Sequence, residues 1–262
     1  MPRGFSLLAG LACVFAALGA GADTLDRDHA LKRSQAALGG APANHAFISS
    51  GGKPVALADL RGKPLVVSFV YTGCFQVCPA TTQYLSLAVE RAEATLGRGR
   101  FNVATVGFNL PFDSPEAMRD FARRQRAERD NWLFLSPRPA SLDALLDDFG
   151  FSSVATASGF DHVLQASILD ADGRLVKQVY GESFSLEALV EPLKALLAGA
   201  PVPADDFAAL VEKVRLLCTV YDPVSGEYRL DYALFAEMLA GLLVIAATAV
   251  FLVRDRLSHR RG

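Results

Sequence analysis

Residues 65–79 read LVVSFVYTGCFQVCP. The first seven form a continuous run dominated by Val and Phe, which predicts a strand buried on both faces of a sheet. Pro79 suits the first position of a helix, so we predict a helix from Cys78, as its N-cap, to about Leu96. Cys74 and Cys78 therefore lie where a buried strand gives way to a helix, a common place for functional sites in open α/β sheets.

Strand and helix patterns alternate along the rest of the body. The predicted strands are 46–48, 54–57, 65–71, 102–108, 132–135, 163–169 and 174–180, and the predicted helices are 78–96, one starting at Ser114, 141–149 and 185–197. This alternation predicts an α/β domain with a largely parallel or mixed sheet covered by helices. Residues 23–38 are charged and lack a sharp apolar stripe, so we expect an arm or a marginal helix there.

Both ends of the chain carry targeting patterns. Residues 1–22 combine a basic start, an apolar run and Ala20-Gly21-Ala22, which predicts a signal peptide cleaved after Ala22. Residues 232–253 are apolar apart from Glu237 and are long enough to span a bilayer, although a buried core helix is the alternative. Arginines follow at once, and the positive-inside rule places them in the cytoplasm.

These patterns predict a single-pass protein of the bacterial inner membrane, with its body in the periplasm and its C-terminus in the cytoplasm. The expected parts are a signal peptide 1–22, an arm 23–45, a folded domain 46–198, a linker and juxtamembrane segment 199–231, a transmembrane helix 232–253 and a tail 254–262. A net charge of −2 gives no indication of nucleic-acid binding.

Cys74 and Cys78 are the strongest candidates for chemistry. An N-cap position at the positive end of a helix would make the Cys78 sulfur ionise more readily than a free thiol. The two sulfurs could close a disulfide or chelate one soft metal ion. The alternative is an inert structural disulfide, but a bond that closes so short a loop removes little chain entropy.

Four histidines are present, at 29, 45, 162 and 259. His29 and His259 lie in the arm and the tail, and His45 has a weak claim before the first strand. His162 lies in the loop that enters the strand 163–169. Taken alone, a histidine there would be structural.

Four blocks, together with their order and spacing, resemble the Sco/SenC family of thioredoxin-fold copper-handling proteins, over about residues 47–197. The blocks are Gly62-Lys63-Pro64 ahead of the buried strand, Cys74-x₃-Cys78-Pro79, Phe112-Asp113-Ser114-Pro115-Glu116, and Asp161-His162 followed by an apolar strand and Asp170-Ala171-Asp172-Gly173. One departure is Gly107-Phe108-Asn109, where the family often has Asp-Pro.

The resemblance implies a thioredoxin-like fold and a mononuclear copper site. Cys74 and Cys78 match the family's two thiolate ligands and His162 its imidazole ligand, a set that suits Cu(I) and tolerates Cu(II). Asp161 could orient that imidazole, or could simply cap the turn.

The implied function is a copper metallochaperone for a respiratory oxidase, with the oxidase's copper-bearing subunit or another copper carrier as partner. Whether the chain is also an enzyme stays open. A membrane-anchored thiol–disulfide oxidoreductase with a redox-active disulfide between Cys74 and Cys78 is the alternative. Cys218 could be a packed thiol or a third working sulfur.

Overall fold

The computed structural model describes residues 25–157, 159–202, 219–222, 227–230 and 248. The chain divides into two units, 1–202 and 203–262. The predicted signal peptide, Cys218, the tail and, apart from Thr248, the predicted transmembrane segment 232–253 lie outside the described residues. Within the described part of the chain, no helix is both long and apolar enough to cross a membrane.

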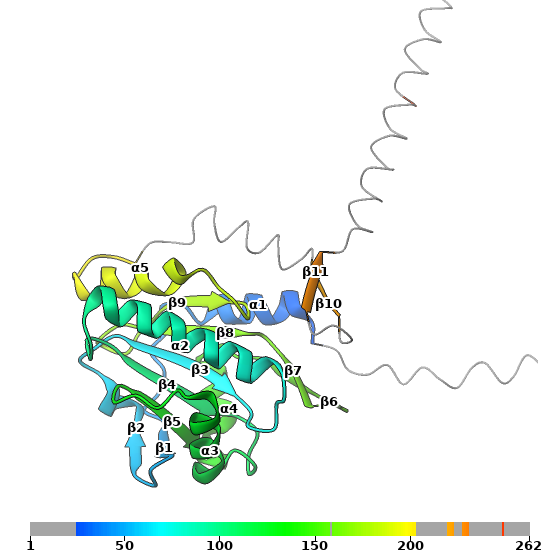
Figure 1. Cartoon of the computed structure of the whole chain (residues 1–262), viewed down its shortest axis with the longest axis horizontal. Helices are drawn as coiled ribbons and strands as arrows, with labels where there is room; N and C mark the ends of the chain where they lie inside the picture. The colour runs from blue at the N-terminus through cyan, green and yellow to red at the C-terminus, as the bar shows by residue number, and fades with distance from the viewer. Residues whose placement is uncertain (1–24, 158, 203–218, 223–226, 231–247, 249–262) are drawn as a thin grey trace, which may run out of the picture. The chain divides into compact units, whose positions relative to one another are not determined.

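The first unit contains a sheet, short helical turns and five α-helices among its described residues (Figure 1). Its strands are β1 (Ala46–Ser49), β2 (Pro54–Ala56), β3 (Leu65–Val70), β4 (Asn102–Gly107), β5 (Trp132–Pro137), β6 (Ser153–Thr156), β7 (Gly159–His162), β8 (Gln165–Leu169) and β9 (Leu175–Tyr180). Its helices are α1 (Arg27–Ala36), η1 (Leu57–Leu60), α2 (Val77–Leu96), α3 (Pro115–Gln125), η2 (Pro139–Ser141), α4 (Leu142–Asp148) and α5 (Leu186–Leu197). In the second unit, β10 (Thr219–Asp222) pairs with β11 (Glu227–Leu230) as an antiparallel hairpin.

The main sheet has seven strands in the order β2-β1-β5-β4-β3-β8-β9. Strands β3, β4 and β5 are parallel, and the outer strands pair antiparallel to their neighbours. Parallel neighbours need crossover connections, which α2 and α3 supply. The predicted mixed sheet flanked by helices is therefore confirmed.

Helices cover both faces of this sheet. Helix α2 packs against α5 and is joined to α3 by a hydrogen bond between Gln83 and Gln125, which places these three helices in one layer. Helices α1 and α4 are joined by the ion pair between Arg33 and Asp147. The Phe69 ring of β3 packs on Phe149, next to α4, with ring centroids 5.5 Å apart.

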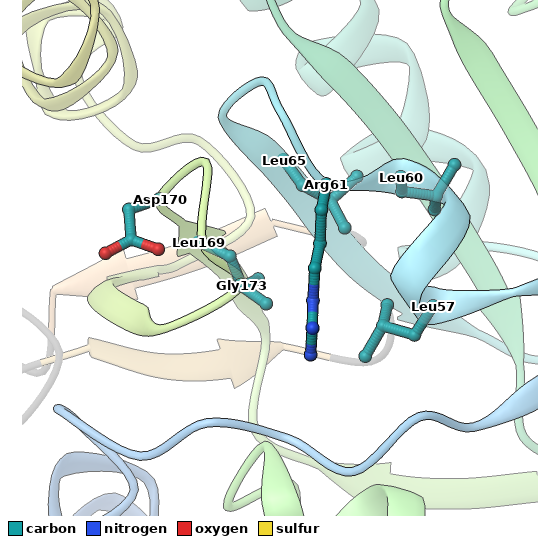
Figure 2. Close-up of a pocket in the computed structure, with 7 residues that line it drawn as sticks. All are labelled: Leu57, Leu60, Arg61, Leu65, Leu169, Asp170 and Gly173. Carbon is teal, nitrogen blue, oxygen red and sulfur yellow. The ribbon is translucent and has the colours of Figure 1, made fainter.

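A shallow pocket lies where β3 begins. It is lined by Leu57, Leu60, Arg61, Leu65, Leu169, Asp170 and Gly173. Figure 2 shows the Arg61 side chain between the two leucines of η1 and the turn that carries Gly173. A strand of six residues spans roughly 20 Å, so the pocket and the cysteine loop are at opposite ends of β3. We therefore assign the pocket no part in the thiol chemistry.

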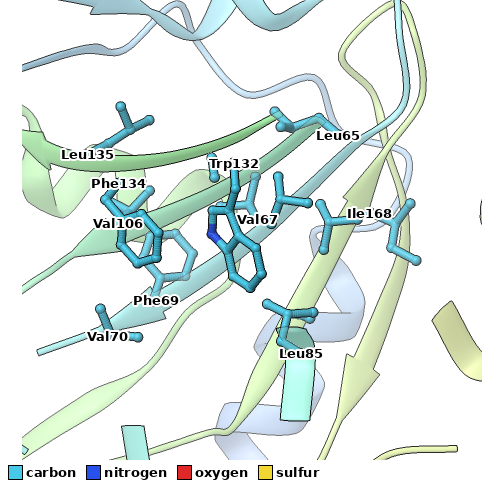
Figure 3. Packing of buried hydrophobic residues seen from close by; sticks show 14 of the residues in the cluster. Leu65, Val67, Phe69, Val70, Leu85, Val106, Trp132, Phe134, Leu135 and Ile168 are labelled. Atoms are coloured by element: carbon cyan, nitrogen blue, oxygen red, sulfur yellow. The ribbon is translucent and has the colours of Figure 1, made fainter. Parts of the chain in front are cut away.

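Strand β3 forms the centre of the core, and all six of its residues are buried (Figure 3). Each fully buried Val, Leu or Phe contributes about 1.5–3 kcal/mol relative to an exposed one. Three polar side chains of these strands hydrogen-bond inside the core: Ser68 Oγ lies 2.9 Å from Thr105 Oγ1, which also accepts a hydrogen bond from Trp132 Nε1. The core therefore holds β3, β4 and β5 in one fixed register.

Helix α1 forms where only an arm or a marginal helix was expected. Asp26 caps its first turn, and Ser34 and Gln35 both hydrogen-bond to the Tyr180 hydroxyl of β9. These are tertiary contacts made by polar side chains. A helix without a sharp apolar stripe can be stabilised in this way, and its sequence then gives only a weak signal.

The hairpin of β6 and β7 was not predicted. Its strands are only partly buried, and they pair as a separate two-stranded sheet. His162 is the last residue of β7 and pairs with Ser153, so it lies in a strand rather than in a loop. Short half-buried strands of small and polar residues have little periodic pattern, which explains the omission.

Gly150 provides a test of how α1 is held. It has φ of +60°, and a Cβ there would lie 2.7 Å from the Arg33 carbonyl oxygen. We expect Gly150→Ala to lower the free energy of unfolding by about 3 kcal/mol, from left-handed backbone strain plus overpacking. Gly99 is the matched control, because it has φ of +70° and no atoms near its Cβ position. Denaturant unfolding that gives equal losses for both substitutions would contradict the close contact.

Candidate thiol and metal site

The two cysteines lie together at the start of α2. The helix begins at Val77 with Gln76 as N-cap, so the N-cap lies two residues before the predicted Cys78. Cys78 is therefore buried inside the first turn, whereas Cys74 is half-buried in the loop before it. The Cys78 backbone N–H donates a hydrogen bond to Cys74 Sγ at 3.2 Å. Both thiols are free.

The electrostatics of the pair differ from the sequence-based expectation. Hydrogen bonds from the Cys78 thiol and from the backbone N–H groups of Cys78 and Gln76 lower the pKa of Cys74 to about 5. The hydrogen bond to Cys74 and burial raise the pKa of Cys78. The prediction that Cys78 is the readily ionised sulfur is therefore wrong.

Cys74 rather than Cys78 carries the charge because of where the two sulfur atoms lie relative to the start of α2. Cys78 belongs to the first turn of the helix, and its backbone N–H donates to the sulfur of Cys74. The N-terminal field of α2 therefore stabilises charge on Cys74. Cys78 supplies two of the hydrogen-bond donors, its backbone N–H and its thiol, and keeps its proton. The pair consists of one thiolate and one buried proton donor.

Tyr71 connects this pair to the neighbouring hairpin. Its hydroxyl donates a hydrogen bond to the Cys74 sulfur, which helps to lower the pKa of Cys74. Burial and that same bond raise the pKa of Tyr71 to about 12. The Tyr71 ring packs against Phe108 and Phe160, with ring centroids 5.6 and 5.2 Å away. The sequence predicted Tyr71 only as the last residue of the buried strand 65–71. In the structure β3 ends at Val70, and Tyr71 is the first residue after it.

His162 lies among the same aromatic rings. Its ring centroid is 5.5 Å from that of Phe108, 5.6 Å from that of Phe151 and 6.2 Å from that of Tyr71. Its Nδ1 lies 3.2 Å from the Val163 carbonyl oxygen, which can only accept, so Nδ1 carries the proton. Burial lowers the pKa of His162. The ring is therefore neutral at pH 7, with a lone pair on Nε2.

The three predicted ligands are brought to one end of the domain but not into one cluster. The two cysteines are in contact, and the charge on Cys74 acts on His162. Among the described residues, no three His, Cys, Asp or Glu side chains are placed to hold a metal ion together. The donor types fit a soft metal such as copper, and simultaneous ligation would need His162 to move closer to the sulfurs.

Two other sequence-based candidates have different partners. The Asp161 carboxylate accepts a hydrogen bond from the Leu25 backbone N–H at 3.3 Å and lies 4.0 Å from Arg27. Successive strand residues face opposite ways, so Asp161 does not orient the His162 ring. His45 is buried and pairs with Asp148 at 2.8 Å, which gives it a structural role.

Two carboxylates near the cysteines were missed as site residues. Asp113 is fully buried and hydrogen-bonds to Thr72 in the cysteine loop. Burial, with a smaller contribution from the charge on Cys74, raises the pKa of Glu182. Asp113 precedes the helix start Ser114-Pro115, and no local pattern indicated that its carboxylate reaches Thr72. No local pattern indicated Glu182.

Comparison with known proteins places this chain in a family. The SCO1/SenC family profile matches residues 34–198. The chain therefore belongs to the SCO1/SenC family, and the suspected resemblance is confirmed. A SCO1 protein homolog from Bacillus subtilis is 24% identical over 159 residues, which cover 57% of this chain and 79% of that protein.

Solved structures of the family share the fold. The copper-bound ScoI structure from Arabidopsis thaliana has a TM-score of 0.53 and 16% identity, covering 60% of this chain and 98% of that one. BsSco, in which a disulfide switch is described, has a TM-score of 0.55 and 21% identity, covering 62% and 95%. BsSco is described as a member of the Sco family of cytochrome c oxidase assembly proteins. Copper is thus the ligand seen in Sco structures.

The charge asymmetry of the two sulfurs can be tested by alkylation. In the reduced protein, iodoacetamide should label Cys74 at least about tenfold faster than Cys78, because the thiolate is the nucleophile. The labelling rate of Cys74 should rise with pH to a plateau, with its midpoint at about 5. Mass spectrometry of the modified peptides measures both. Preferential labelling of Cys78 would contradict the assignment.

Matched tyrosine variants identify the role of the hydroxyl. Tyr71→Phe removes a donor to Cys74 and should move the labelling midpoint to higher pH, because the thiolate loses stabilisation. Tyr84→Phe is the control, since the Tyr84 hydroxyl donates to the Phe184 carbonyl. It should leave the midpoint unchanged.

Proposed function

We propose that this protein is a copper metallochaperone that delivers copper to the copper site of a respiratory oxidase. Its ligands would be Cys74, Cys78 and His162. Membership of the SCO1/SenC family and the copper-bound Sco structures support the cargo. The observation that carries the proposal is the adjacent pair of free sulfurs at the same end of the domain as a neutral, half-buried imidazole.

The chemistry of these donors suits transfer. Sulfur and imidazole ligands favour Cu(I) and tolerate Cu(II). Cys74 is a thiolate before the metal arrives, whereas Cys78 must release its proton on binding. His162 belongs to a two-stranded hairpin outside the main sheet, and such hairpins are marginally stable alone. A ligand on such an element can join and leave the copper at low cost, which suits a carrier.

The same pair supports a second candidate, thiol–disulfide reduction of the partner's cysteines. The Cys74 thiolate would attack a partner disulfide, forming a mixed disulfide and releasing one partner thiolate. Cys78 would then lose its proton and attack the Cys74 sulfur, which closes the Cys74–Cys78 disulfide and releases the second partner thiolate. Two electrons pass to the partner. The low pKa of Cys74 favours this activity.

For the partner, we propose the copper-bearing subunit of the oxidase or another copper carrier. We also propose attachment to the bacterial inner membrane through residues 232–253, with the domain in the periplasm. The apolar composition of that segment and the arginines after it support this topology. A periplasmic domain would work in a compartment where disulfides form, as a reversible thiol pair requires.

His162 separates the two functions. His162→Ala should weaken copper retention by at least about tenfold, since a ligand contributes more than the groups that support it. Disulfide exchange by Cys74 and Cys78 should remain largely intact, because thiolate attack needs no metal ligand. Copper per protein after dialysis, the Cu(II)–thiolate absorption band and the rate of disulfide exchange measure these effects.

His29→Ala is the control, because His29 is exposed on α1. In cells with scarce copper, His162→Ala should lose oxidase assembly almost as completely as Cys78→Ala. Normal assembly by His162→Ala, alongside failure of Cys78→Ala, would make the reductase the primary function. Equal copper content and affinity in wild type and His162→Ala would remove His162 from the ligand set.

The topology proposal predicts where a reporter works. A reporter fused after Gly262 should be active only if it functions in the cytoplasm, because the arginines after residue 253 favour that side. The measurement compares two fusions, one of a cytoplasm-dependent reporter and one of a periplasm-dependent reporter. Activity of the periplasm-dependent reporter at this position would refute the proposed orientation.

A further inference from the structure

We propose that Asp113 is a positioning residue for the thiol pair. Its buried carboxylate holds Thr72 and thereby sets the Cys74 sulfur over the start of α2. This inference rests on the proposed function, because it takes Cys74 and Cys78 as the working sulfurs. Asp113 itself does not touch the copper or the partner in this scheme.

Three donors converge on the Asp113 carboxylate. Oδ1 accepts hydrogen bonds from the Thr72 backbone N–H at 2.8 Å and from the Thr72 hydroxyl at 2.7 Å. Oδ2 accepts one from the Asn109 backbone N–H at 2.7 Å. The residue is 0% exposed. Burial of a carboxylate is costly unless its oxygens are hydrogen-bonded, and here both oxygens are.

The Asp113 backbone is itself held in place. Its N–H donates to the Asn109 carbonyl at 2.9 Å, and its carbonyl accepts from Ser136 Oγ at 2.7 Å. Gly107 allows the close approach, because a Cβ there would lie 2.5 Å from the Asp113 Cβ. The position of Asp113 is therefore fixed by the end of β4, by β5 and by the start of α3, and not by the cysteine loop.

Thr72 links Asp113 to the position of the Cys74 sulfur. The Cys74 backbone N–H donates to the Tyr71 carbonyl at 3.1 Å, so residues 71–74 form a turn with Thr72 as its second residue. The turn places Cys74 Sγ 3.2 Å from the Cys78 backbone nitrogen. Gly73 within this turn is exposed and has no Cβ contact closer than 3.9 Å. Packing around Gly73 therefore restrains the turn little, and the two hydrogen bonds from Thr72 to Asp113 restrain it instead.

Preorganisation of two sulfurs has a measurable consequence. The less freedom the loop has, the higher the effective concentration of one sulfur at the other. Glutathione disulfide can oxidise the reduced pair, and the reaction gives one Cys74–Cys78 disulfide and two glutathione thiols. Its equilibrium constant in metal-free protein reports the effective concentration without involving copper.

Thr72→Val is the principal variant, because it keeps the shape of the side chain and removes the hydroxyl donor. We expect its equilibrium constant for disulfide formation to fall about fivefold, the effect of one hydrogen bond. Thr72→Ser restores the hydroxyl and should remain within about twofold of wild type. Asp113→Asn removes the negative charge and replaces one acceptor oxygen with an amino group that would face a donor, so it should give a larger fall than Thr72→Val.

Ser68→Ala is the matched control for general destabilisation. Ser68 is buried in β3, and its hydroxyl pairs with Thr105 in the core rather than with the cysteine loop. This variant should lower the melting temperature and leave the equilibrium constant unchanged. All variants are compared at a temperature at which circular dichroism shows them folded. If Asp113→Asn does not fold, Thr72→Val and Thr72→Ser decide the matter.

An equilibrium constant for Thr72→Val within about twofold of wild type would overturn the proposal, since it would leave the hydroxyl bond without effect. An equal fall in Ser68→Ala would also overturn it, by showing a general loss of stability. A copper titration of the wild-type protein is done alongside. Failure of wild type to bind copper would count against the metallochaperone function. The equilibrium constants for disulfide formation, measured in metal-free wild type and variants, would still decide the role of Asp113.

Discussion

The parallel pairing of β3 with β4 is the constraint on which the site depends. Val70 pairs with Gly107 at the last rung of the two strands, and the Phe108 N–H donates to the Val70 carbonyl at 3.0 Å just beyond it. The loops that follow both strands therefore leave the sheet at the same edge. Tyr71 then meets Phe108, and Thr72 meets Asp113. A shift of this register would separate the cysteine loop from its anchor.

The antiparallel pairing of β8 with β3 brings the third element to the same edge. Ala166 pairs with Ser68, so the chain enters β8 beside the end of β3. The hairpin of β6 and β7 precedes β8 directly and thus carries His162 to the rings around Tyr71. A site composed of residues 74, 78 and 162 follows from this topology. The pocket at the other end of β3 receives none of these loops.

Within the site, the structure reverses the sequence-based assignment of the two cysteines. Cys74 collects hydrogen bonds and carries the charge, whereas Cys78 is buried and keeps its proton. That arrangement serves both thiol exchange and soft-metal capture, because each begins with one available thiolate. The half-buried imidazole of His162 is the feature that thiol exchange does not require. The two proposed activities thus share one anionic sulfur and differ in their need for His162.

The sequence by itself determined the sheet covered by helices and the strand–helix junction at Cys74 and Cys78, because buried runs, helix starts and paired cysteines are local patterns. His162 became a candidate ligand only through the family resemblance. Only the tertiary structure decided which sulfur is charged, since that depends on where the Cys78 N–H points. It also decided that α1 is helical, that His162 ends a strand, that Asp161 faces Leu25, and that Asp113 holds Thr72. Each of these features is made by groups far apart in sequence or by the direction of one side chain. Hydrophobic periodicity carries no information about either.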